Sequence, residues 1–98
     1  MTQVGAGGVL ITRLSYSKRF AKDYARNPGL HDRVKKQLGG LLKHPLPPGL
    51  CFEKLKGYSK PDIYTIHVTG NYKISMSIEG SQATLRRLGT HDEIDRAP

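Results

Sequence analysis

The clearest pattern along the chain is an alternation of apolar and polar residues over residues 63–69 and again over 72–78. Its apolar positions are Tyr64, Ile66, Val68, Tyr72, Ile74, Met76 and Ile78. A period of two predicts two strands, each with one apolar face. The intervening Thr69-Gly70-Asn71 predicts a three-residue hairpin loop with Asn71 in the left-handed conformation, because this loop length brings both apolar faces to the same side.

This hairpin register has a consequence on the polar face. It pairs Val68 with Tyr72 and therefore sets His67 directly opposite Lys73, with their Cβ atoms about 5 Å apart. A last strand is predicted over residues 83–88, after a Gly80-Ser81 turn. Continuous pairing of that strand places Arg86 opposite Ser75, so Arg86 is expected to join His67 and Lys73.

The N-terminal half shows helical rather than strand periodicity. A short β-rich run over residues 9–14 predicts a first strand. Ser15 or Ser17 can cap the helix that follows, in which Phe20 and Tyr24 lie one turn apart and form an apolar stripe.

A second helix is predicted to start at Asn27-Pro28, because asparagine caps helices well and proline suits the first helical position. Its apolar stripe consists of Leu30, Val34, Leu38 and Leu41. The helix is expected to stop before His44-Pro45, and a proline-rich segment then leads to a short edge strand over residues 52–56.

Together these elements give the order β-α-α-β-β-β-β and an α+β fold. Two N-terminal helices are expected to pack on one face of a twisted, mainly antiparallel sheet, which leaves the His67 and Lys73 face uncovered. The chain is interpreted as a single domain over residues 9–94, with a flexible Gly-rich tail at 1–8 and a C-terminal tail at 95–98.

Charge narrows the class of partner. The 98 residues carry a net charge of +8, and residues 1–60 hold twelve of the 16 basic side chains but only three of the eight acidic ones. Such a field favours RNA, DNA or an acidic protein as partner. The single cysteine, Cys51, excludes an internal disulfide, and the chain shows neither a signal sequence nor a bilayer-spanning run. We therefore expect a cytoplasmic protein with no membrane partner.

Five segments between Leu10 and Ile94 resemble the RelE/ParE superfamily of toxins from type II toxin–antitoxin pairs. They are residues 20–24 (FAKDY), 53–57 (EKLKG), 63–68 (IYTIHV), 70–74 (GNYKI) and 87–92 (RLGTHD). His67 and the Gly-Thr-His ending at 89–91 are most similar to the YafQ-type branch, and Glu53 to the YoeB-type branch. The resemblance implies a RelE-like microbial RNase fold and a ribosome-dependent mRNA endoribonuclease. It also implies a cognate antitoxin, ribosome and mRNA as partners, and a toxin–antitoxin complex that binds operator DNA.

The candidate catalytic residues fit that chemistry. Cleavage of RNA by its own 2′-hydroxyl needs a base, an acid and cations around the phosphate. His67 and His91 are the natural acid–base pair, Lys73 the cation and Glu53 a second candidate base, with the assignment among them open. Lys73 stands where many members of the superfamily have arginine, so the charge is kept and the planar fork is lost. This chemistry requires no metal and no cofactor.

The remaining charged residues are candidates for ligand binding or for structural roles. Arg86, Arg87, Lys54 and Lys56 are candidate RNA or phosphate ligands. The basic residues Arg33, Lys35, Lys36 and Lys43 on the second helix form a solubilising face, or by resemblance a surface along ribosomal RNA. His31 and His44 are expected to be structural, and Asp92, Glu93 and Asp95 a solvated acidic tail.

Two alternatives stay open at this level. The ParE branch shares the fold and acts on DNA gyrase without cutting RNA, although His67, His91 and Glu53 argue against it. The second alternative is a relative that has lost catalysis and binds RNA or a protein partner.

Overall fold

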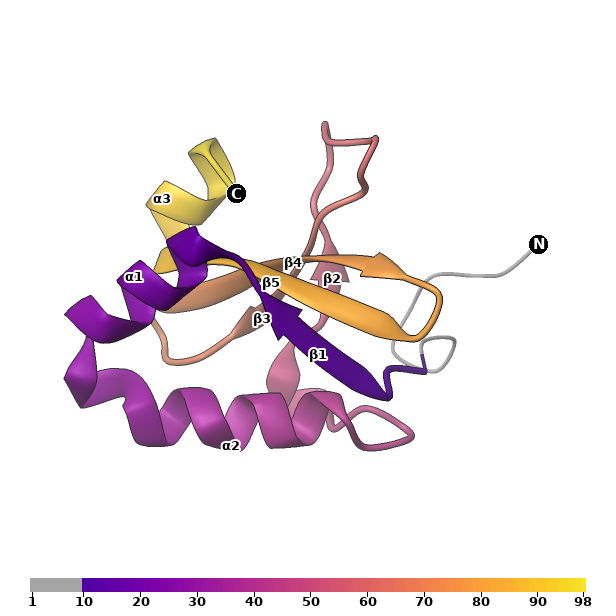
Figure 1. Ribbon diagram of the computed structural model, residues 1–98, viewed down its shortest axis with the longest axis horizontal. Coiled ribbons are helices and arrows are strands. Elements are labelled where there is room, and N and C mark those ends of the chain that lie inside the picture. Colours follow the sequence, from indigo (N-terminus) through magenta and orange to yellow (C-terminus); the bar gives the residue numbers. More distant parts are fainter. Residues whose placement is uncertain (1–9) are drawn as a thin grey trace.

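The computed structural model describes residues 10–98 and consists of one five-stranded sheet with helices on both sides (Figure 1). The expectation for the Gly-rich segment 1–8 lies outside the described residues. The strands are β1 (Arg13–Tyr16), β2 (Glu53–Lys54), β3 (Tyr64–His67), β4 (Tyr72–Glu79) and β5 (Gln82–Thr90). They lie in the order β1-β5-β4-β3-β2, with β1 parallel to β5 and every other pair antiparallel. The predicted α+β class and mainly antiparallel sheet are confirmed.

The two N-terminal helices occur where the sequence predicts them. Helix α1 (Lys18–Arg26) begins after Ser17, whose side chain accepts a hydrogen bond from the Phe20 amide at 3.0 Å. A short 3₁₀ turn, η2 (Pro28–Leu30), then precedes α2 (His31–Leu41). The Asn27 side chain does not cap this second helix and instead donates to the Asp23 carbonyl. A second 3₁₀ turn, η3 (Pro48–Leu50), leads to β2.

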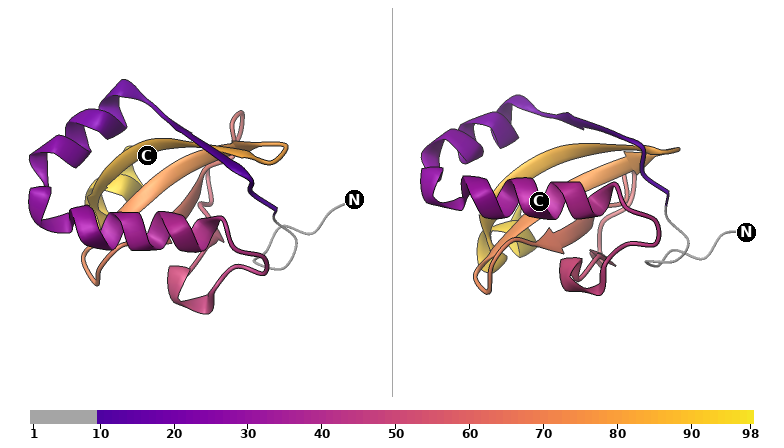
Figure 2. Two further views of the ribbon diagram at one scale, coloured as in Figure 1. Left: turned by 60° about the horizontal axis from the view of Figure 1, so that its bottom comes forward. Right: turned by 90° about the horizontal axis from the view of Figure 1, so that it is seen from below.

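The helix α2 runs across the apolar face of the sheet, as the views from below make clear (Figure 2). Residues from α1 and α2 form one buried cluster with the apolar residues of the strands. The core of this cluster includes Phe20, Val34, Leu41, Ile66, Ile74, Met76, Leu85 and Leu88. The helical layer and the alternating strands therefore bury the faces that the pattern predicts.

The β3–β4 hairpin has the predicted register, with Ile66 opposite Ile74 and His67 opposite Lys73. The conformation predicted for Asn71 is wrong, because it is not among the non-glycine residues with positive φ in the described chain. The side chain of Thr69 organises the loop instead: its hydroxyl accepts hydrogen bonds from the amides of Asn71 and Tyr72, both at 3.2 Å.

The register predicted between β4 and β5 is correct only up to Met76. A β-bulge follows, so that Ser75 lies opposite Arg87 rather than Arg86. The physical reason is the order Leu85-Arg86-Arg87-Leu88, in which two apolar residues flank two arginines. One extra residue in β5 lets both leucines enter the core, whereas strict alternation would turn Leu88 out of it.

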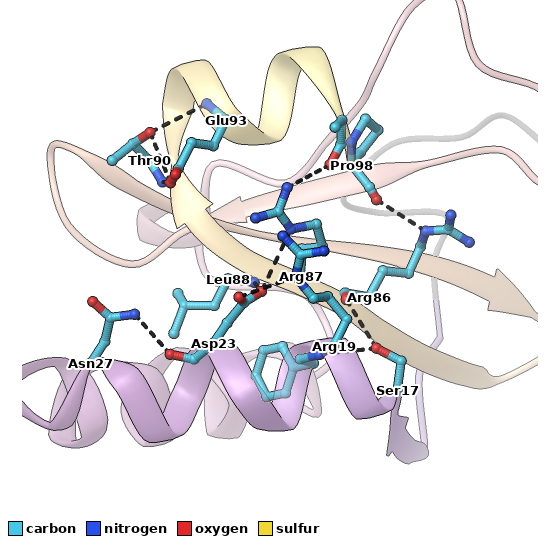
Figure 3. Close-up of polar contacts among 12 residues, drawn as sticks. Ser17, Arg19, Asp23, Asn27, Arg86, Arg87, Leu88, Thr90, Glu93 and Pro98 are labelled. Atoms are coloured by element: carbon cyan, nitrogen blue, oxygen red, sulfur yellow. Dashed lines mark hydrogen bonds and ion pairs between the residues drawn. The ribbon is translucent and has the colours of Figure 1, made fainter.

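Beyond β1, the edge of β5 is completed by the start of α1 (Figure 3). The Ser17 amide donates to the Leu85 carbonyl at 2.9 Å, and the Ser17 hydroxyl donates to the Arg86 carbonyl at 2.9 Å. The buried carboxylate of Asp23 then accepts the Leu88 amide at 3.0 Å and lies 3.6 Å from Arg87 Nε. These contacts satisfy backbone groups that the short β1 leaves without a strand partner.

A third helix, α3 (His91–Arg96), lies on the other side of the sheet and was not predicted (Figure 1). Asp92, Glu93 and Asp95 are solvent-exposed as expected, but they lie on this helix and not in a tail. Thr90 and Glu93 form a reciprocal capping box, and their hydrogen bonds lower the pKa of Glu93 below its ordinary value of 4.5. The spacing Thr-x-x-Glu is a known signal for a helix start. Gly89 leaves room for this helix, because a Cβ there would lie 2.9 Å from Glu93 Oε1.

We expect replacement of Asp23 by alanine to destabilise the fold by about 3 kcal/mol, because it leaves the Leu88 amide without its acceptor and the partly buried Arg87 without its carboxylate partner. Urea denaturation monitored by circular dichroism measures the effect. The control is Glu79→Ala, which removes an exposed carboxylate that forms no ion pair within residues 10–98 and should change stability by less than about 0.5 kcal/mol. Equal effects of the two variants would contradict the assigned role of Asp23.

Candidate active site

Two histidine rings meet at the edge of the sheet that α3 covers. His67 is the last residue of β3, and His91 is the first residue of α3. Their ring centroids are 4.7 Å apart, and the rings are inclined by 63° in an edge-to-face arrangement. The backbone amide of His91 donates to the Asn71 carbonyl at 2.9 Å, which ties the start of α3 to the β3–β4 loop. The structure thus brings together the two histidines that the sequence analysis singled out.

Lys73 lies beside this pair, buried and held by two carboxylates. It is only 5% exposed, and its Nζ is 3.1 Å from Asp95 Oδ1 and 3.9 Å from Glu53 Oε1. The face was expected to be open, but α3 packs against β4 and β5 and contributes Asp95. Two negative charges compensate the burial of this ammonium, since an isolated buried charge is costly.

The charges around His91 act on its protonation. Burial, the positive charge of Lys73 and the proximity of His67 lower its pKa below the ordinary 6.5, while Asp95 and Glu53 oppose this shift. The ring is therefore neutral at pH 7. Its Nε2 is out of contact with solvent and has no hydrogen-bond partner within residues 10–98, which also disfavours a second ring N–H. Because the unfolded chain binds this proton more readily, His91 makes the fold less stable as the pH falls below 6.5.

Arg86 and Arg87, two of the predicted phosphate ligands, lie in different environments. Arg87 faces the same side as Ser75 but is engaged by Asp23 and by the Ala97 carbonyl, to which its Nη1 donates at 3.1 Å. Arg86 is the bulged residue and donates from Nε to the Pro98 carbonyl at 3.3 Å (Figure 3). The expectation that Arg86 joins His67 and Lys73 through the strand register is wrong, because the bulge displaces it from the position opposite Ser75.

Lys54 and Lys56, which lie in and after the edge strand β2, do not join the two histidines. Lys54 lies opposite Tyr64, so it belongs to the opposite side of β2 from Glu53, and its Nζ is 3.5 Å from Asp62 Oδ2. Lys56 is exposed in the turn after β2. Glu53 therefore joins the histidine site through Lys73, whereas neither Lys54 nor Lys56 forms a contact with it in the described residues.

Neither a metal site nor a membrane span emerges from the described chain. Within residues 10–98, no group of three or more His, Cys, Asp or Glu side chains is placed to hold a metal ion. No helix in that part of the chain combines the length and the apolar character needed to cross a membrane.

Comparison with known proteins identifies the fold. No family model matches the sequence, and no curated protein matches it significantly. Eighteen chains of solved structures do match. The toxin in the RelB–RelE antitoxin–toxin complex from Methanococcus jannaschii is 29% identical, with a TM-score of 0.65 over 86% of this chain and 99% of that one. The chain therefore has the fold of the RelE-like toxins and is similar to them in sequence.

Two further solved structures share this fold. A chain of the E. coli DinJ–YafQ toxin–antitoxin complex aligns with a TM-score of 0.71 at 23% identity, over 86% of this chain and 98% of that one. A copper-bound mutant toxin from Helicobacter pylori aligns with a TM-score of 0.64 at 26% identity, over 86% and 99% of the two chains. The likeness to the E. coli complex is evidence of a common fold.

Two residues of this site are not predicted by the sequence analysis. Asp95 was placed in a tail, although the capping box at Thr90 and Glu93 signals the helix that carries it. Gln37 of α2 donates from Nε2 to the His67 carbonyl at 2.7 Å and so fixes the backbone of that histidine. No sequence signal points to Gln37, since its partner lies 30 residues away.

We expect opposite shifts of the His91 pKa in two variants. Lys73→Met keeps the apolar stem but removes the positive charge, so the pKa should rise toward 6.5. Asp95→Asn removes a charge that favours the protonated ring, so the pKa should fall further. NMR titration of the His91 ring protons measures both shifts, with the exposed Lys56→Met as control. Shifts in the same direction would show that these charges do not govern His91.

Proposed function

We propose that this protein is the toxin of a type II toxin–antitoxin pair and a metal-independent endoribonuclease that cleaves mRNA on the ribosome. The single observation that carries the proposal is the contact between the His67 and His91 rings beside the buried Lys73. Two imidazoles and a cation in one place supply the acid, the base and the charge stabilisation that RNA cleavage requires.

His91 acts as the base in this proposal. Because its lowered pKa keeps the ring neutral, it can accept the proton of the RNA 2′-hydroxyl. The 2′ oxygen then attacks the adjacent phosphorus, and the bond from phosphorus to the 5′ oxygen breaks. His67 donates the proton that the departing 5′ oxygen takes up. The products are a 2′,3′-cyclic phosphate and a free 5′-hydroxyl, and a proton returns from His91 to His67 through solvent.

Lys73 contributes a fixed positive charge and is not free to move and grip the phosphate. Its ammonium is already bound by Asp95 and Glu53, which leaves it fixed near the two rings. A fixed positive charge lowers the His91 pKa and also favours the negative charge that builds on the phosphate. Glu53 is exposed and acts through Lys73 in this arrangement, so it is a positioning residue rather than the base.

The partners follow from the same proposal. Complexes of relatives with antitoxins, DinJ–YafQ and RelB–RelE, support a cognate antitoxin for this chain. The excess of basic residues in the N-terminal half suits an acidic or amphipathic antitoxin segment and the RNA of the ribosome. The toxin–antitoxin complex would bind operator DNA, and the toxin would act in the cytoplasm.

The proposal predicts loss of mRNA cleavage in His91→Ala. Ribosomes programmed with a defined message and incubated with the protein should yield cut mRNA, mapped by primer extension. His91→Ala should reduce the single-turnover rate by about 10²- to 10⁴-fold, the usual contribution of one proton transfer, and His67→Ala by at least about tenfold. His44→Ala is the matched control, because this exposed histidine bonds the Ile11 carbonyl and lies in another region of the fold.

Two outcomes would overturn this function. Intact message together with inhibited DNA supercoiling by gyrase would make the chain a gyrase-directed toxin. Intact message with retained RNA binding would make it a binding protein without catalysis. Circular dichroism of each variant separates loss of catalysis from loss of fold.

A further inference from the structure

A basic pocket of about 460 Å³ lies next to the histidine site, between α2, η3 and the β3–β4 loop. Arg33 and Lys36 of α2 and Lys43 of the following turn line it, together with Gln37 and His67. Residues 33, 36, 37 and 40 follow a helical spacing of three and four, so they share one face of α2. His67 is the residue common to this pocket and to the pair of rings.

The pocket is built from fixed elements. The Gln37 amide nitrogen donates to the His67 carbonyl at 2.7 Å and to the Gly49 carbonyl at 3.4 Å, which ties α2 to β3 and to η3. Gly40 of α2 is buried against the side chains of Pro47 and Leu50. The three basic side chains therefore surround a concavity with a defined floor.

The side chains around this pocket give it a positive charge. Arg33, Lys36 and Lys43 are exposed, and none of them forms an ion pair within residues 10–98. No acidic residue lines the pocket. In contrast, Lys54, Lys73 and Arg87 each face a carboxylate. Three uncompensated positive charges around one cavity create a local field that an anionic ligand would neutralise.

We propose that this pocket binds the phosphate backbone of the RNA strand next to the nucleotide held by His67 and His91. The proposal rests on the proposed function and adds to it a second binding subsite. The repeated phosphates of RNA suit this pocket, because one strand can run from the two rings around the β3–β4 loop to the basic side chains on the α2 side of the sheet. An acidic protein fits less well, because no Phe, Tyr or Trp side chain lines the pocket and protein interfaces draw on such anchors.

The test uses a fluorescent single-stranded RNA with 2′-O-methyl groups, which the proposed reaction cannot cleave. The double variant Lys36→Ala/Lys43→Ala should weaken binding by about tenfold at 0.1 M salt. It should also reduce the slope of log K against log salt by about 1.4, because each phosphate contact with single strands contributes about 0.7. Fluorescence anisotropy over a salt series measures both quantities, and thermal unfolding checks the fold.

The matched control is Lys22→Ala/Lys35→Ala, which removes the same charge. Lys35 is adjacent to Lys36 in sequence but lines a different groove with Tyr16 and Leu38, and Lys22 is exposed on α1. This control should retain the salt slope of the unchanged protein. Equal losses in both double variants would reduce the effect to net charge and overturn the subsite.

Two further arms identify the source of the anion. Weaker binding of the pocket variant to empty ribosomes, with unchanged binding to the oligonucleotide, would assign the pocket to ribosomal RNA and overturn the proposal. Weaker binding to a polyglutamate peptide alone would assign it to an acidic protein and overturn it as well. The oligonucleotide is not cut, so binding is read independently of catalysis. If the unchanged protein binds it but leaves mRNA intact, the proposed function fails while the subsite stands.

Discussion

The site depends on the bulge that places one extra residue of β5 opposite Ser75 and Met76. Without it, Leu88 would lie opposite Lys73 and point away from the core. With it, Gly89 takes that position, and the next residues begin α3 directly above Lys73. Burial of both leucines therefore sets the register that carries His91 to His67. The core and the candidate active site are two results of one packing constraint.

The charge balance of the site depends on the side chains that α3 places over the sheet. A buried ammonium needs negative partners, and α3 supplies Asp95 while β2 supplies Glu53. The same helix carries His91, whose pKa responds to Lys73 and to both carboxylates. Protonation of the ring and burial of the lysine are thus coupled through one short helix, which the Thr90–Glu93 capping box and Gly89 hold in place.

Two groups of basic residues in this chain differ in their surroundings. Those near the sheet, such as Lys73 and Arg87, are engaged by Asp95, Glu53 and Asp23 and serve the fold and the local charge balance. Those on α2 that line the basic pocket face solvent without a carboxylate partner in the described chain. The net charge of +8 alone does not distinguish these groups, because the distinction depends on which carboxylates each basic side chain reaches in the folded structure.

The sequence by itself determined the strands, the hairpin register and the neighbourhood of His67 and Lys73, because alternation and a short loop are local constraints. It also placed the start of α1 through its Ser17 cap. Only the tertiary structure decided the β5 bulge, the burial of Lys73 under α3 and the link from Gln37 to His67. These features depend on competition between distant groups for core space and for hydrogen-bond partners, which no local pattern resolves.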